Sequence, residues 1–131
     1  MEANVSFSRE TFPTTSFQDG LILDVMTLIP ENPHAILQIA HGMCEHKERY
    51  LPFMEYMAGQ GYACIIHDHR GHGKSVRSPE DLGYFYSNGG PALVKDLHQI
   101  TRYIRGIFPE LPFYLLGHSM GSLAARVYLK Y

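Results

Sequence analysis

The chain has 131 residues, with 11 Lys and Arg against 13 Asp and Glu, a net charge of −2 with histidine neutral, and 45% hydrophobic residues, which is the composition of one ordinary globular domain. A charge so close to zero, without runs of like charge, leaves no electrostatic footprint for nucleic acid and no polybasic patch for an anionic membrane. The longest apolar stretches are far shorter than the roughly 18 residues needed to span a bilayer.

The first half of the chain predicts a hairpin followed by a strand and a helix. Segments 16–18 and 21–29 flank Asp19-Gly20, a dipeptide typical of tight turns between antiparallel strands. The short apolar run 35–40 then predicts a buried strand. A helix is expected over 50–60, where apolar residues recur at helical spacing and glycines follow.

The same alternation continues in the second half. Apolar runs at 63–67 and 113–116 predict two more buried strands, joined by a polar loop with several glycines and then a helix. In that helix, apolar residues step by fours and threes from Leu93 to Ile107. Strands that alternate with helices indicate an α/β fold: a mostly parallel sheet with an antiparallel N-terminal hairpin and helices on both faces.

The sequence ends inside the last expected helix. This helix carries an apolar stripe of Leu123, Val127 and Tyr131 and has no capping glycine or following proline. The strand before it would form an exposed apolar edge of the sheet. We therefore expect residues 1–131 to be an incomplete domain, completed by further polypeptide or by a second chain.

The clearest chemical motif is Gly-x-Ser-x-Gly at Gly117, Ser119 and Gly121, placed between a predicted strand and a predicted helix. A nucleophilic serine in such a turn adopts a strained backbone, so the positions two before and two after it need very small side chains. The helix N-terminus would direct backbone N–H groups at the oxyanion that develops during acyl transfer. The pattern favours Ser119 as a nucleophile over a glycine-rich packing turn.

A second motif, beginning with His41 and Gly42, follows the first buried strand. In hydrolases with a serine elbow, a loop at this place supplies the second oxyanion donor. We expect the backbone N–H groups of Met43 and Met120 to form the oxyanion hole, with His41 and Gly42 in support. The alternative is a turn that merely ends the strand and contains a structural histidine.

Charged residues near these motifs are expected to have structural roles. Glu45 and Arg49 are four residues apart and would form an ion pair. In the segment 67–75, Asp68 and Arg70 would make charge-assisted hydrogen bonds that fix this loop beside the serine turn. The alternating histidines of the segment are interpreted as part of the loop scaffold rather than as a metal site.

The order of these motifs resembles the N-terminal part of an α/β-hydrolase. More narrowly, the segments 41–50 and 68–75 resemble the monoacylglycerol lipase and lysophospholipase group, among serine aminopeptidase-type hydrolases. The resemblance implies that the serine and the two amides named above act on an ester of a fatty acid. It also implies that no metal or organic cofactor takes part.

The sequence departs from this family after the serine. In the fold, the catalytic triad follows the chain order Ser, Asp or Glu, His, but the twelve residues after Ser119 contain no Asp, Glu or His. The triad acid and base are therefore expected outside this sequence, and this chain alone is expected to be inactive. A non-catalytic half-domain that binds a partner or itself is one alternative, and an acyltransferase or peptidase is another. The first twelve residues lack a secretory signal, which predicts a cytoplasmic protein.

Overall fold

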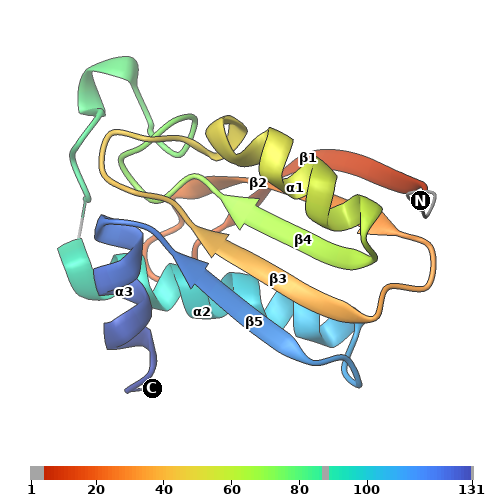
Figure 1. Ribbon diagram of the computed structural model, residues 1–131. Coiled ribbons are helices and arrows are strands. Elements are labelled where there is room, and N and C mark those ends of the chain that lie inside the picture. The colour runs from red at the N-terminus through yellow and green to blue at the C-terminus, as the bar shows by residue number, and fades with distance from the viewer. Residues whose placement is uncertain (1–4, 87–88, 131) are drawn as a thin grey trace.

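The computed structural model describes residues 5–86 and 89–130, so Tyr131 of the predicted apolar stripe lies outside the described residues. Five strands form one sheet, and helices lie on both sides of it (Figure 1). The elements in chain order are β1 (Phe7–Thr15), β2 (Ile22–Pro30), β3 (Ala35–Ala40), the 3₁₀ turn η1 (Lys47–Tyr50), α1 (Leu51–Gly59), β4 (Tyr62–His67), the 3₁₀ turn η2 (Pro79–Asp81), α2 (Gly89–Ile107), β5 (Phe113–Gly117) and α3 (Met120–Tyr128).

The strand order is β1-β2-β4-β3-β5. Strands β4, β3 and β5 are parallel, whereas β1 and β2 form an antiparallel hairpin whose second strand runs antiparallel to β4. The chain winds from β3 to β4 on one side and then crosses back to β5 on the other side of β3. The expected α/β architecture, with parallel strands after an N-terminal hairpin, is confirmed.

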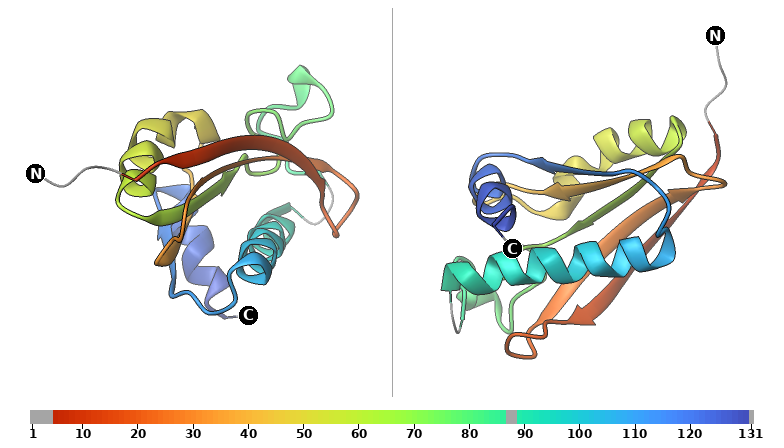
Figure 2. Two further views of the ribbon diagram at one scale, coloured as in Figure 1. Left: turned by 90° about the vertical axis from the view of Figure 1, so that its right-hand side faces the viewer. Right: turned by 90° about the horizontal axis from the view of Figure 1, so that it is seen from below.

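Helix α1 covers one face of the sheet, and α2 and α3 cover the other (Figure 2). Both helical layers bury apolar side chains, and β3 and β4 lie between them, which is why their sequences are mostly apolar, with Gln38 in β3 as a buried polar exception. On the α1 face the core consists of Met26, Leu28, Leu37, Ile39, Met54, Ala58, Cys64 and Ile66. On the opposite face it consists of Val25, Ile36, Ile65, Ile100 and Ile104, continued by Ala40, Leu93, Val94, Leu97 and Ala124.

The hairpin is present, but the prediction of a strand at residues 16–18 is wrong. These residues belong to the turn, which Ser16 closes by donating its N–H to the carbonyl of Leu21 at 2.8 Å. The strand lies earlier, at β1, which forms the outer edge of the sheet and is mostly exposed. Its polar sequence and Pro13 show no apolar alternation, because an exposed edge strand needs little apolar surface and tolerates proline.

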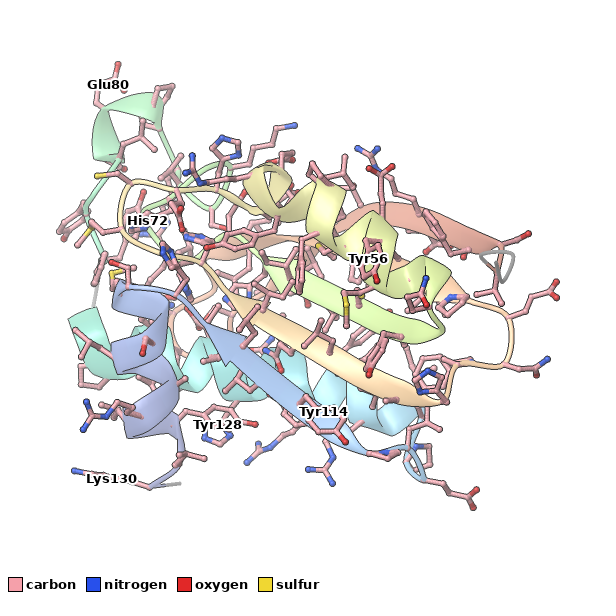
Figure 3. All side chains as sticks on the ribbon, viewed as in Figure 1. Tyr56, His72, Glu80, Tyr114, Tyr128 and Lys130 are labelled. Atoms are coloured by element: carbon pink, nitrogen blue, oxygen red, sulfur yellow. The ribbon has the colours of Figure 1, made fainter. Side chains whose placement is uncertain are left out.

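The opposite edge of the sheet is β5, beyond which no strand pairs within the described part of the chain. Tyr114, labelled in Figure 3, lies on this strand with 55% of its surface exposed, and Leu116 is 39% exposed. Leu123 and Val127 of α3 are also exposed. The expected apolar edge is therefore present. Among the described residues, no helix is both long and apolar enough to cross a membrane.

Candidate active site

The three sequence motifs meet at one end of the sheet. They occupy the loops after β3, β4 and β5, and the carboxyl ends of these parallel strands point the same way (Figure 1). His72, in the loop after β4, marks this end in Figure 3. The loops after β3 and β5 lead to helices on opposite faces of the sheet (Figure 2). Such a switch point leaves a crevice where α/β proteins bind ligands.

Ser119 stands at the turn between β5 and α3, with backbone angles φ 57° and ψ −119°. This conformation is strained for a residue with a side chain. A side chain on Gly121 would collide with the backbone carbonyl of Ala40, and one on Gly117 would collide with the backbone of Gly121. The two glycines therefore allow the serine turn to lie directly against the end of β3, while Ser119 itself is exposed to solvent.

One of the two predicted oxyanion amides belongs to this turn, and the other belongs to the loop after β3. Met120 is the first residue of α3, so its N–H has no acceptor within the helix. The loop that contains Met43 lies against the serine turn, since a Cβ atom added to Gly42 would be 3.1 Å from Cβ of Ser119. In the described part of the chain, the Met43 N–H has no acceptor.

His41 is fully buried behind this loop and links it to the loop after β4. Its Nε2 accepts the backbone N–H of His69 at 2.9 Å, so the neutral ring has its proton on Nδ1, which donates to the carbonyl of Gly42 at 2.8 Å. Burial lowers the pKa of His41 below its ordinary value, with the nearby His72 acting in the same direction. His41 is therefore held as one neutral tautomer.

Asp68 ties together the loops after β3 and β4. One of its oxygens accepts the backbone N–H of Lys47 at 2.7 Å, and the other accepts that of Lys74 at 3.0 Å. The Lys47 ammonium is fully buried, 3.1 Å from Asp68 and 2.5 Å from Asp24. Burial opposes its charge, but these carboxylates raise the pKa of Lys47 above its ordinary value.

Arg70 makes the expected charge-assisted hydrogen bonds, and its partners lie on the hairpin turn and on α2. Its buried guanidinium binds Asp96 of α2 through Nε at 2.7 Å and Asp19 of the hairpin turn through Nη1 at 2.9 Å. It also donates to the carbonyl of Phe85 at 3.0 Å and to Oγ of Ser16 at 3.1 Å. Arg70 therefore joins the loop to the hairpin turn and to α2, because these two elements supply its carboxylate partners.

The other histidines of this loop form a buried cluster with His41. Ring centroids of neighbours lie 4.2 to 6.3 Å apart, and the two ring nitrogens of His67 have no partner among the described residues. Burial lowers the pKa of His67 to about 3. Within residues 5–86 and 89–130, no group of three or more His, Cys, Asp or Glu side chains is arranged to hold a metal ion.

Two charged residues have larger roles than the sequence predicts. The ion pair between Glu45 and Arg49 is confirmed at 2.7 Å, but the other oxygen of Glu45 binds the loop and the serine turn. The sequence does not indicate the role of Lys47, since its partners, the half-buried Asp24 and the buried Asp68, are distant in sequence.

The sequence matches the family described as Hydrolase_4, serine aminopeptidase S33, over residues 31–131. It is 36% identical to the monoglyceride lipase homolog of monkeypox virus over 93 residues, which are 69% of this chain and 31% of that protein. It is 33% identical to human monoglyceride lipase over 93 residues, which are 71% of this chain and 29% of that protein. The chain thus spans about a third of the length of these curated relatives.

Solved structures agree with this match. The crystal structure of a thermostable carboxyl esterase from Bacillus coagulans, in complex with glycerol, superposes with a TM-score of 0.85 and 30% identity. The superposition covers 92% of this chain and 39% of that esterase. Together with the sheet order and the loops at its carboxyl end, these similarities show that the chain belongs to the serine aminopeptidase S33 family of α/β-hydrolases.

Proposed function

We propose that the protein is a serine hydrolase that acts on fatty-acyl esters of the monoacylglycerol or lysophospholipid type. The observation that carries the proposal is the exposed Ser119, held in a strained turn at the N-terminus of α3 with Gly42 packed against it. Relatives named as monoglyceride lipases and as a carboxyl esterase support the reaction and the substrate class. Cytoplasmic location stays a prediction from the sequence.

The proposed reaction proceeds through an acyl-enzyme. Oγ of Ser119 attacks the ester carbonyl carbon while its proton passes to a general base, and the N–H groups of Met43 and Met120 bind the resulting oxyanion. The tetrahedral intermediate collapses, and the alcohol leaves with the proton that the base returns. Water then attacks the acyl-enzyme through the same base, which releases the fatty acid and restores Ser119.

The general base and its supporting acid are proposed to come from polypeptide outside the 131 residues. The chain covers only about a third of its curated relatives. The open edge of β5, where Tyr114 and Leu116 are exposed, offers the place at which a further parallel strand would bind. Without a base, the hydroxyl of Ser119 would be a poor nucleophile at neutral pH.

Intact mass spectrometry after fluorophosphonate treatment tests the proposal. The chain is tagged at its own locus, purified with any polypeptide that accompanies it, and analysed under denaturing conditions with and without the probe. One adduct on Ser119, absent from the Ser119→Ala variant, together with a second or a longer polypeptide, is the expected result. Adducts on other residues alone would contradict the proposed nucleophile. Chromatography of products from monoacylglycerol and lysophospholipid would identify the substrate, and products with amine or alcohol acceptors would instead indicate a peptidase or an acyltransferase.

The exposed β5 edge also favours a second candidate, a non-catalytic half-domain that binds a partner or a second copy of itself. This candidate predicts a single polypeptide of 14.9 kDa that gains no fluorophosphonate adduct but associates in sedimentation experiments. Replacing Leu116 by Lys on the exposed edge would then weaken association. A monomer with a Ser119 adduct would exclude the half-domain.

A further inference from the structure

The peptide units around Gly42 are held from several sides. The N–H of Gly42 donates to Oε1 of Glu45 at 2.6 Å. Its carbonyl accepts both the backbone N–H of Glu45 at 3.2 Å and Nδ1–H of His41 at 2.8 Å. The chain can fold back in this way because Cys44 adopts a left-handed conformation with φ 60°. Gly42 is itself buried, so these contacts are shielded from water.

These contacts determine which amide of the loop is available to a ligand. A trans peptide is planar, so the carbonyl of Gly42 and the N–H of Met43 point in opposite directions. Because His41 and the Glu45 backbone hold that carbonyl on one side, the Met43 N–H is directed to the other. The Gly42 N–H is already occupied by the Glu45 carboxylate, and the Met43 N–H is the donor left over.

The Glu45 carboxylate also connects this loop with neighbouring elements. Its Oε1 accepts the hydroxyl of Tyr50 at 2.7 Å and lies 3.4 Å from Nδ1 of His118, the residue directly before the serine. Burial alone would raise the pKa of Glu45, but hydrogen bonds from Tyr50 and Gly42 lower it to about 2. The group is therefore a carboxylate at neutral pH and accepts hydrogen bonds only.

We propose that Glu45 is a positioning residue. Its carboxylate fixes the His41–Gly42 peptide, so that the adjoining Gly42–Met43 peptide keeps the Met43 N–H facing the ester oxyanion, and it ties this loop to the serine turn through His118. The inference rests on the proposed function, since it needs an oxyanion at Ser119. It differs from the role expected from the sequence, in which Glu45 only pairs with Arg49. That ion pair uses the other carboxylate oxygen, so the two roles are separable.

Nuclear magnetic resonance of the ¹⁵N-labelled protein, purified with any polypeptide that accompanies it, tests the hydrogen bond without any catalysis. In the wild type, the Gly42 amide proton is expected at low field and protected from exchange with solvent. Glu45→Ala should move it upfield and speed its exchange at least about tenfold, because its acceptor is removed. Glu45→Gln, which retains an acceptor oxygen, should give an intermediate result. Arg49→Ala is the matched control and should leave the Gly42 signal in place. An unchanged signal in Glu45→Ala would overturn the inference, even if Ser119 proves to be the nucleophile.

Kinetics of the purified protein, together with any polypeptide that accompanies it, test the consequence for the reaction. Loss of one oxyanion donor lowers kcat by about 10² to 10³, so misdirecting the Met43 N–H in Glu45→Ala should lower kcat at least about tenfold with KM within about threefold. Affinity for a trifluoromethyl ketone, which forms a tetrahedral oxyanion, should fall by a similar factor, and Glu45→Gln should restore part of both. Glu55→Ala, an exposed position on α1, is the activity control. A Gly42 signal that shifts while kcat stays unchanged would refute the positioning role, and a wild type without a Ser119 adduct would refute the proposed function itself.

Discussion

Replacing Arg70 by Met is expected to destabilise the protein severely. The guanidinium is fully buried and gives its N–H groups to Asp96, Asp19, the Phe85 carbonyl and Ser16. Methionine fills much of the same volume but leaves the buried Asp96 carboxylate without its cation. Removing one partner of a buried ion pair costs about 3–5 kcal/mol, which is a large part of the roughly 5–15 kcal/mol that stabilises a typical domain.

Urea unfolding measures this loss. With a dependence of about 2 kcal/mol per molar urea, the midpoint should fall by about 2 M. Burial raises the pKa of Asp96, and the hydrogen bond from Arg70 opposes that rise. Without Arg70, the Asp96 carboxyl group should protonate more readily. The difference in the free energy of unfolding between variant and wild type should therefore become smaller as the pH is lowered.

Two comparisons make the prediction refutable. The double variant with Asp96→Leu removes the unpaired charge and should recover part of the lost stability. Arg9→Met, at an exposed position on β1, should stay within about 0.5 kcal/mol of the wild type. A midpoint for Arg70→Met within about 0.3 M of the wild type, or a double variant no more stable than the single one, would contradict the reasoning.

Three further predictions concern packing, thiol reactivity and pH. Gly121→Ala places a methyl group against the backbone carbonyl at the end of β3 and should lower the free energy of unfolding in urea by about 3 kcal/mol. The control Gly106→Ala, which has open space around its Cβ, should not lower this free energy. Equal effects of the two substitutions would refute the packing argument. Iodoacetamide should modify the exposed Cys44 in the native protein but Cys64 only after unfolding, because burial raises the pKa of Cys64 to about 12. Mass spectrometry would show the order of modification. Labelling of Cys64 in the native protein would contradict the prediction. Burial lowers the pKa of His67 to about 3, so the stabilisation that depends on its neutral form is present above its ordinary pKa near 6.5 and is lost as the pH falls toward 3. About 2 kcal/mol of the free energy of unfolding should be lost by pH 5. His67→Phe should flatten the pH dependence of this free energy between pH 7 and 5, and identical slopes in variant and wild type would argue against His67 as its origin.

The sequence alone predicts correctly the order of the buried strands and helices and the sharp turn at Ser119 between a strand and a helix. Strands β3 and β4 are mostly apolar because both of their faces are covered, β5 is an apolar run at the open edge, and α2 carries an apolar face at helical spacing. The turn at Ser119 requires glycine on either side, so the five-residue pattern marks it within the chain itself. Each of these features can be predicted from a pattern of neighbouring residues in the sequence.

No such pattern of neighbouring residues predicts the edge strand β1. Most of its side chains are exposed, so no apolar alternation distinguishes Phe7–Thr15 from a loop, and the hairpin signal at Asp19-Gly20 located only the turn. Because of the same exposure, the sequence predicts the strand too close to the turn.

Only the tertiary structure decided the partners of the buried charges. Lys47 pairs with Asp24 and Asp68, and Arg70 pairs with Asp96 across the fold. A buried charge is stable only beside an opposite charge, and the folded chain decides which opposite charge lies close enough. The spacing of residues in the sequence does not predict that distance. Glu45 shows the same limit at close range, because its separation from Arg49 indicates a simple ion pair, whereas the left-handed turn at Cys44 brings its carboxylate back onto the Gly42 amide.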